Sequence, residues 1–139
     1  MKIAVIDGQG GGIGRLIVEK LRRELGQSCF IIGLGTNAVA TSVMLKAGAN
    51  EGASGENALV FSLKEVDLIV GSISLIAANS YCGELTPRMA EAIATARAVK
   101  VLIPMNRYGI EITCNNDEPL PIQVDYLVSR VKQLCNEVN

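Results

Sequence analysis

The chain has 139 residues, of which 49% are hydrophobic, and its 13 basic and 14 acidic residues give a formal net charge of -1. That balance leaves no basic face for nucleic acid, and the longest apolar run, residues 68–78, is too short to cross a bilayer. Histidine is absent and the cysteines Cys29, Cys82, Cys114 and Cys135 form no C-x-x-C pair, so the usual zinc sites and the His-dependent nucleophiles are excluded.

The length and the first residues set the class of protein. A chain of this size can bury most of the surface that its unfolded form exposes, so we expect one domain over residues 1–139. The N-terminus has a single lysine, four apolar residues and then Asp7, which is the pattern of a strand rather than of a signal peptide. We therefore expect a cytoplasmic protein with no metal site, no membrane segment and no nucleic-acid partner.

A glycine-rich loop separates the first expected strand, residues 3–6, from a helix over residues 13–25. Five glycines in seven positions allow positive φ angles and close approach to a ligand, and the helix aims its free N–H groups at the loop. The alternative is a tight turn that binds nothing, but such a turn needs fewer glycines. We predict a phosphate-binding loop formed by Gly8, Gln9, Gly10, Gly11, Gly12, Ile13 and Gly14.

The loop resembles that of the short-chain dehydrogenase/reductase superfamily, because Gly8 and Gly12-Ile13-Gly14 fit the pattern G-x-x-x-G-I-G. The resemblance covers about the first 35 residues and implies a Rossmann-type nucleotide fold. It departs from the family at Asp7, where a threonine is usual. The catalytic pair of a tyrosine and a lysine four positions later is also missing, so the chemistry of that superfamily is not supported.

Over nearly its full length the chain resembles a different family. From MKIAVIDGQGGGIG through VDLIVGS to VLIPMNR it looks like a family of small bacterial proteins that is described only as a domain of unknown function. That resemblance implies no activity.

The remaining segments alternate between strand and helix patterns, which predicts a three-layer, Rossmann-like α/β fold with a mainly parallel sheet. Residues 110–113 follow the strand before them too closely for a parallel crossover, so we expect them to form an antiparallel edge strand. Residues 49–55 are expected to form a mobile loop. The other expected strands are 29–32, 68–70 and 101–103, and the other expected helices are 38–46, 56–64, 87–98 and 122–137.

In a parallel sheet, ligands bind beyond the carboxyl ends of the strands. Thr36 and Asn37 either only cap the following helix or also donate to a 2′-phosphate. Ser72 either forms a turn or contacts the ligand, and Arg107 either grips an anion or is an exposed turn residue. The predicted contacts at this edge, besides the glycine loop, are Gly35, Thr36, Asn37, Gly71 and Ser72 for the cofactor and Asn106 and Arg107 for a substrate.

The cofactor prediction follows from the end of the second strand. A carboxylate there would bind the ribose of NAD and repel the 2′-phosphate of NADP, and residues 33–37 contain none, so we predict NAD(P) with NADP slightly favoured. The protein is then either a small oxidoreductase in which the cofactor carries the chemistry, or a non-catalytic nucleotide-sensing or regulatory module. The missing proton-transfer residues slightly favour the second alternative.

The helix expected over residues 38–46 is apolar around most of its circumference, with polar side chains only at Thr41, Ser42 and Lys46. A surface helix of a monomer normally shows a wider polar face. We therefore predict a homo-oligomer with this helix in the contact, unless the loop at 49–55 folds over it.

Overall fold

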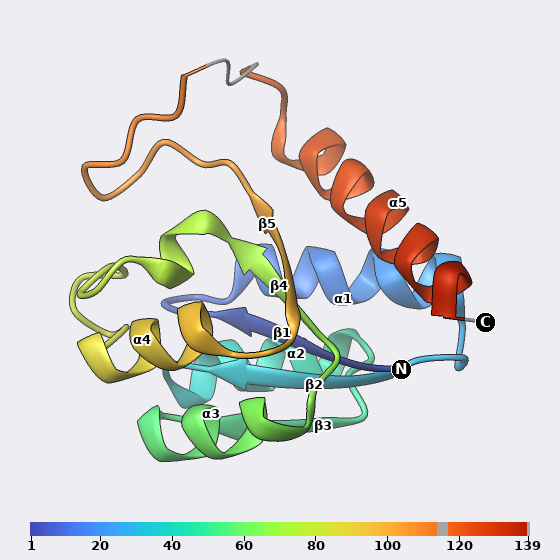
Figure 1. Cartoon of the computed structure of the whole chain (residues 1–139), viewed down its shortest axis with the longest axis horizontal. Coiled ribbons are helices and arrows are strands. Elements are labelled where there is room, and N and C mark those ends of the chain that lie inside the picture. Colours follow the sequence, from blue (N-terminus) through green and yellow to red (C-terminus); the bar gives the residue numbers. More distant parts are fainter. Residues whose placement is uncertain (114–116, 139) are drawn as a thin grey trace.

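The computed structural model describes residues 1–113 and 117–138, so Cys114 lies outside the described residues. Its centre is a five-stranded, fully parallel sheet with the strand order β3-β2-β1-β4-β5 and helices on both faces (Figure 1). The three-layer, Rossmann-like fold predicted from the sequence is confirmed. The strands are β1 (Lys2–Asp7), β2 (Phe30–Gly35), β3 (Glu51–Ser54), β4 (Leu68–Ser72) and β5 (Val99–Ile103).

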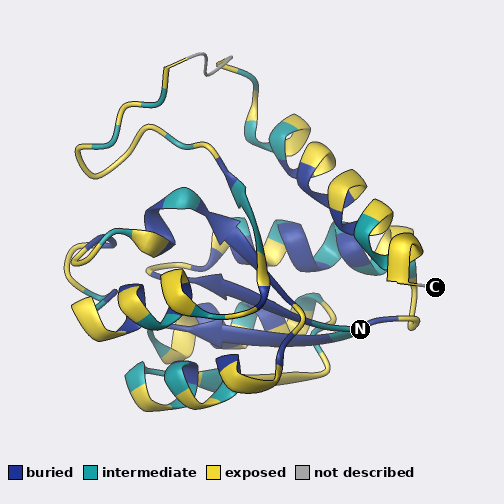
Figure 2. Cartoon of the chain, in the orientation of Figure 1, coloured by how far each residue is buried: buried dark blue, intermediate teal, exposed yellow. Residues whose placement is uncertain are grey.

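The helices form two layers, one on each face of the sheet. The first layer contains α1 (Gly12–Leu25), α2 (Ala38–Ala47) and the C-terminal α5 (Leu120–Val138). The second contains α3 (Glu56–Ser62) and α4 (Pro87–Thr95), with short 3-10 turns at Leu63–Glu65 and Ile73–Ile76. The burial colouring shows β1, β2 and β4 mainly in dark blue and β5 mainly in teal, while the outer sides of the helices are yellow (Figure 2).

The central strand explains how one sheet supplies two cores. Ile3 and Val5 of β1 face the α1 and α5 layer, whereas Ala4 and Ile6 face the α3 and α4 layer, and all four are fully or almost fully buried. Side chains alternate between the two faces of a strand, so a strand covered on both faces must be apolar at every position.

Two predicted helix starts are confirmed by their capping contacts. The Asn37 Oδ1 atom accepts a hydrogen bond from the Ala40 amide at 2.9 Å, and the Thr86 Oγ1 atom accepts one from the Met89 amide at 3.1 Å. Each contact satisfies an amide that has no partner within its own helix.

The edge of the sheet corrects the sequence prediction. Residues 110–113 form no strand, and the predicted antiparallel edge strand is wrong. The edge strand next to β2 is instead β3, which pairs in parallel with β2. It lies within residues 49–55, the segment that was expected to form a mobile loop. The physical reason is tertiary contact: Gly52 lies so close to α2 that a Cβ atom there would be 2.7 Å from Thr41 Cγ2.

The strand order fixes where the two halves of the sheet meet. From β1 the chain builds outward through β2 and β3, then crosses to the other side of β1 to form β4 and β5. The carboxyl ends of β1 and β4 therefore diverge at a topological switch point, which is the usual ligand position in open α/β sheets. Asp7 ends β1 and Ser72 ends β4 at this point.

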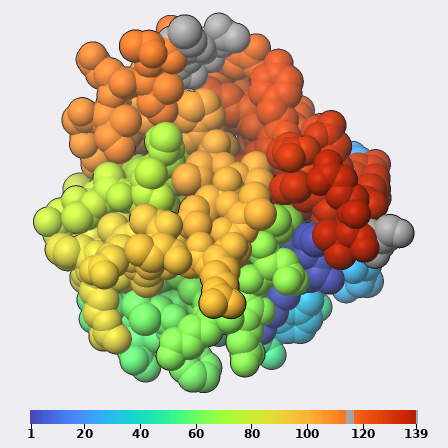
Figure 3. Space-filling view, viewed as in Figure 1, coloured from blue at the N-terminus to red at the C-terminus, as the bar shows by residue number. Residues whose placement is uncertain are grey.

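The segment after β5 reaches over this end of the molecule before the chain enters α5. The space-filling view shows it in orange beside the red α5 helix, above the green and yellow surface formed by the chain from β4 to α4 (Figure 3). Over residues 1–113 and 117–138, none of the helices combines the length and the apolar character that crossing a membrane would need.

Candidate functional site

Asp7 lies beneath the glycine loop at the end of β1 and is only 3% exposed. Its Oδ1 atom accepts a hydrogen bond from the Gly8 amide at 2.8 Å, and its Oδ2 atom accepts one from the Gly14 amide at 2.7 Å. Burial raises the pKa of Asp7 above its usual value, although these amides and the positive charge of Arg107 act in the opposite direction. The first turn of α1 is thus capped by a carboxylate of the chain itself.

Three glycines of the loop are required by the fold. A Cβ atom at Gly8 would lie 2.9 Å from the Tyr81 ring, and one at Gly14 would lie 2.7 Å from Met44 Sδ. Gly11 has a φ of 74° and a Cβ atom there would come within 2.5 Å of Val43 Cγ2. Turn geometry and packing account for these positions without any ligand.

Gly10 and Gly12 differ from the other three. A Cβ atom at either position would meet no atom within 4 Å, and neither residue has a positive φ. Neither the turn nor the packing therefore requires glycine at these two exposed positions. Within the described part of the chain, no hydrogen bond engages the amide of Gly10 or of Gly12.

A shallow pocket of about 180 Å³ lies over the loop at the switch point. Arg107 reaches it from the segment after β5, and among residues 1–113 and 117–138 its guanidinium has no hydrogen-bond or ion-pair partner. The pocket therefore combines free amides with a cation that has no acceptor. Its lining consists of Asp7, Gly8, Gln9, Gly10, Gly11, Gly12, Ile13, Tyr81 and Arg107.

Tyr81 forms the opposite wall from a left-handed position, with a φ of 57°. Its side chain is anchored from below, because Ser74 Oγ donates a hydrogen bond to the Tyr81 hydroxyl at 3.2 Å and lies 2.8 Å from Ser72 Oγ. Burial raises the pKa of Tyr81 to about 12, so the phenol is protonated at neutral pH. No pattern in the sequence indicates Tyr81 as a site residue, because it lies in an irregular loop.

The remaining predicted contacts lie at the same edge but outside the pocket lining. Ser72 is 2% exposed and pairs with Ser74, while Gly71 packs so that a Cβ atom would meet Ile6 O at 2.8 Å. Asn106 Oδ1 accepts a hydrogen bond from the Ile112 amide at 2.8 Å. Gly35, Thr36 and Asn37 lie at the end of β2 beside the loop.

Glu84 is a second carboxylate at this edge, and it corrects the prediction of NADP. Its Oε1 atom accepts hydrogen bonds from Thr36 Oγ1 at 2.5 Å, from the Gln9 amide at 2.8 Å and from Asn37 Nδ2 at 2.8 Å. These hydrogen bonds lower the pKa of Glu84, and the one from Thr36 has the largest effect. A carboxylate therefore lies at the end of β2 after all, supplied by a loop 48 residues further along the chain.

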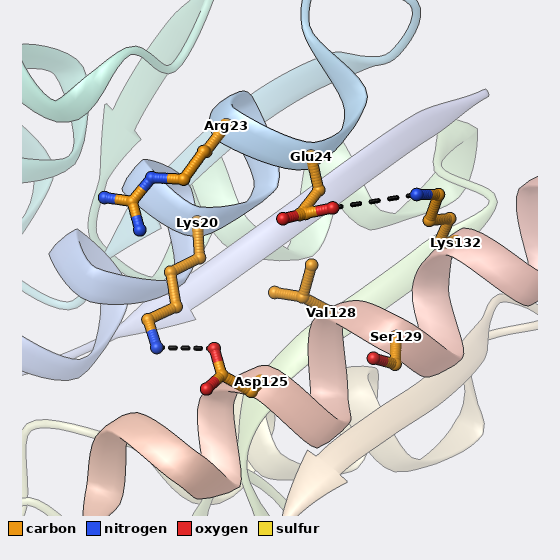
Figure 4. A pocket seen from close by; sticks show the side chains of 7 residues that line it. All are labelled: Lys20, Arg23, Glu24, Asp125, Val128, Ser129 and Lys132. Atoms are coloured by element: carbon orange, nitrogen blue, oxygen red, sulfur yellow. Dashed lines mark hydrogen bonds and ion pairs between the residues drawn. The ribbon is translucent and has the colours of Figure 1, made fainter.

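A larger hollow of about 410 Å³ lies between α1 and α5 (Figure 4). Four of its charged side chains form two ion pairs, since Lys20 Nζ lies 2.5 Å from Asp125 Oδ1 and Lys132 Nζ lies 3.6 Å from Glu24 Oε2. Lys20 also donates to the Pro121 carbonyl at 2.8 Å, so it fastens the start of α5 to α1. We assign this hollow to helix packing.

Comparison with known proteins adds one distant likeness in structure. A dodecameric FMN-dependent UbiX-like decarboxylase from Escherichia coli O157:H7 matches with a TM-score of 0.46 and 16% identity over 95% of this chain and 76% of that chain. No curated protein matches the sequence.

The prediction of NAD(P), as the cofactor of a small oxidoreductase or as the ligand of a nucleotide-sensing module, is therefore wrong. The solved structure reported above is of a protein named FMN-dependent, not NAD(P)-dependent. The physical reason lies in the loop: the carboxylates of Asp7 and Glu84 take up amides that a pyrophosphate and a ribose phosphate would need. The pocket of about 180 Å³ is also below the range of about 300–1,000 Å³ in which drug-sized ligands are bound.

The resemblance of the loop to that of short-chain dehydrogenases stays a prediction. A family model, in contrast, matches residues 2–136, which is nearly all of the chain. The chain belongs to the family described as Domain of unknown function (DUF3842).

Proposed function

We propose that the protein binds a compact small molecule through one anionic group, a phosphate or a carboxylate, at the glycine loop. The observation that carries this proposal is that Gly10 and Gly12 are glycines where the fold does not require them. A ligand that approaches the backbone explains both positions, because any side chain there would occupy the space above the loop.

The charge arrangement supports an anionic group of small size. The Arg107 guanidinium can bind a phosphate or a carboxylate through two parallel hydrogen bonds, in a bidentate arrangement. The amides of Gly10 and Gly12 add two donors, the second of them in the first turn of α1. Asp7 beneath the loop limits how much negative charge the pocket accepts, which favours one anionic group over a pyrophosphate.

The proposal is tested by titrating the protein with inorganic phosphate and with acetate, following amide shifts by NMR. We expect the shifts to concentrate at residues 10–13. Gly12→Val should abolish them while leaving the fold intact, because a Cβ atom at this position would meet no protein atom within 4 Å. Gly12→Ala should weaken binding by a smaller amount.

Arg107→Ala should weaken binding by about tenfold or more, the size of one charge-assisted pair. The matched control is Arg97→Ala, which removes an exposed arginine outside the pocket. Unchanged affinity in both Gly12→Val and Arg107→Ala would overturn the proposal.

We also propose that the protein self-associates through α2. Val39 and Leu45 of this helix are 61% and 42% exposed, so β3 beside the helix does not cover them completely. Free thiols at Cys29, Cys82 and Cys135 are compatible with a reducing compartment, so a cytoplasmic location stays part of the proposal.

A further inference from the structure

The segment that carries Arg107 is a closed turn. The Ile110 amide donates to the Arg107 carbonyl at 3.0 Å, and Asn106 Oδ1 accepts from the Ile112 amide at 2.8 Å. Tyr108 and Gly109 both have left-handed φ angles, of 55° and 78°. The backbone at Arg107 is thus held by local hydrogen bonds, but these bonds do not fix its long side chain.

An aromatic contact joins this turn to Tyr81 in the wall of the pocket. The Tyr108 ring centroid lies 5.4 Å from that of Tyr81 with the ring planes tilted by 45°, a favourable geometry for an aromatic pair. Tyr81 is itself 3% exposed and is fixed by Ser74 and by its packing against Gly8. Tyr108 is therefore attached to a rigid part of the molecule.

The Tyr108 ring also contacts the Arg107 guanidinium. The Arg107 guanidinium carbon lies 5.7 Å from the Tyr108 ring centroid, within the range of a cation–π contact. Among the residues that the structure describes, no carboxylate and no hydrogen bond holds this guanidinium, so the ring is the contact that limits its motion. An arginine without such a contact would spread over many rotamers.

We infer that Tyr108 is the positioning residue of the anion site: stacked on Tyr81, it holds the Arg107 guanidinium over the glycine loop. The inference rests on the proposed function for its biological meaning. Its structural content, that Tyr108 places Arg107 near Asp7, can be tested in the protein without any ligand.

The first measurement is the affinity for inorganic phosphate. Tyr108→Ala should weaken binding by about threefold to fivefold, the size of one exposed cation–π contact. Tyr108→Phe should restore the wild-type affinity, because no hydrogen bond engages the Tyr108 hydroxyl within residues 1–113 and 117–138. Tyr108→Leu fills the space beside Tyr81 without an aromatic face and should behave like the alanine variant.

The matched control is Tyr126→Ala, which removes a tyrosine that is 61% exposed on α5 and should leave the affinity unchanged. The chain has three tyrosines and no tryptophan, so the near-ultraviolet circular dichroism of each variant reports on the remaining tyrosines and shows whether the fold is kept.

The second measurement is the pKa of Asp7 in the ligand-free protein, read from the carboxyl carbon shift. Burial raises the pKa of Asp7, whereas the amides of Gly14, Gly8 and Ile13 and the charge of Arg107 lower it. Among the groups that lower this pKa, Arg107 is the one that contacts the Tyr108 ring. Tyr108→Ala and Tyr108→Leu should therefore raise the pKa of Asp7 toward its value in Arg107→Ala.

The outcomes separate the inference from the proposed function. A rise in the pKa of Asp7 in both variants supports the inference even where phosphate fails to bind, and that failure overturns only the proposed function. An Asp7 pKa that is the same in Tyr108→Ala as in the wild type overturns the inference, whatever the phosphate affinity.

Discussion

Asp7 occupies the place of a bound anion at the start of α1, with its two oxygens on the Gly8 and Gly14 amides. The usual function of a glycine loop before a helix is to offer such amides to a phosphate. Here the fold uses part of that capacity for its own carboxylate. The amides of Gly10 and Gly12 are left for an external group.

The charge of Asp7 predicts a pH dependence of anion binding. Burial raises the pKa of Asp7, and an ionised Asp7 repels an anion above the loop. Binding should therefore strengthen as the pH falls from neutral through the pKa of Asp7, by up to about tenfold for a coupling of one pKa unit. Sulfate is the suitable probe because its charge stays constant in this range.

Two observations check this assignment. Asp7→Asn should bind sulfate with an affinity that no longer depends on pH in this window, and should lose about 1–3 kcal/mol of stability because its amide group cannot accept both backbone hydrogen bonds. Glu84 stays ionised over the window, since its hydrogen bond from Thr36 lowers its pKa. A pH dependence that persists in Asp7→Asn would contradict the assignment.

At the scale of elements, the sequence predicted the helices and the buried strands well because their signals are local. Apolar periodicity and capping residues such as Asn37 and Thr86 act within a few positions. The strand β3 carries no such signal: its sequence EGAS is neither apolar nor β-branched. Its pairing arises from β2 and α2, so periodicity could not reveal it.

The strand that was predicted at residues 110–113 but is absent from the structure has a related explanation. The β-branched Ile110 and Ile112 suggest a strand, but the left-handed residues Tyr108 and Gly109 turn the chain back, and Asn106 takes the Ile112 amide. A side-chain contact thus replaces the ladder that the propensity predicts.

The close contact of β3 with α2 makes Gly52 sensitive to substitution. In Gly52→Val the Cβ atom would lie 2.7 Å from Thr41 Cγ2 and 2.9 Å from Leu45 Cγ, so the helix must shift. We expect a loss of about 1–3 kcal/mol in the free energy of unfolding, measured with urea. Gly12→Val is the matched control, because a Cβ atom at Gly12 would meet no atom within 4 Å. Equal stability of the two variants would argue against a β3 that is packed on α2.

The exposed residues of α2 give a test of self-association. Val39→Glu should convert an oligomer into folded monomers, because a charge would be buried in the contact. Val43 and Leu45 are less suitable, since their side chains lie against Gly11 and Gly52 of the same chain. The control is Val138→Glu at the far end of α5, where the side chain is 72% exposed. A wild-type sedimentation mass of 14.7 kDa at micromolar concentration would exclude the proposed oligomer.

At the scale of the whole molecule, the sequence predicted the position of the candidate site but not its chemistry. The carboxyl ends of parallel strands meet at one edge, so the glycine loop and Arg107 were expected there together. The walls of the pocket come from Tyr81, and the charge at the end of β2 comes from Glu84. Both lie on an irregular loop whose path depends on tertiary contacts, which spacing along the chain cannot reveal.

Cooperative unfolding tests whether residues 1–139 form one domain, which stays a prediction. The two cores lie on opposite faces of the sheet but share β1, since Ile3 and Ala4 belong to different cores. We expect a single unfolding transition with coincident changes in circular dichroism and tyrosine fluorescence. Two separate transitions would show that the faces unfold independently.

Gln9 connects the glycine loop to α2, and this connection has a thermodynamic consequence. Its amide donates to Glu84, its carbonyl accepts from Asn37 Nδ2 at 2.9 Å, and Asn37 in turn caps α2 through the Ala40 amide. The ligand proposed above the loop and the second subunit proposed on α2 would therefore act on one connected set of hydrogen bonds. Thermodynamic linkage then requires that the anion changes the affinity between subunits by the same factor by which the second subunit changes the affinity for the anion. Titrating the anion at several protein concentrations, and the subunits at several anion concentrations, measures this shared coupling free energy.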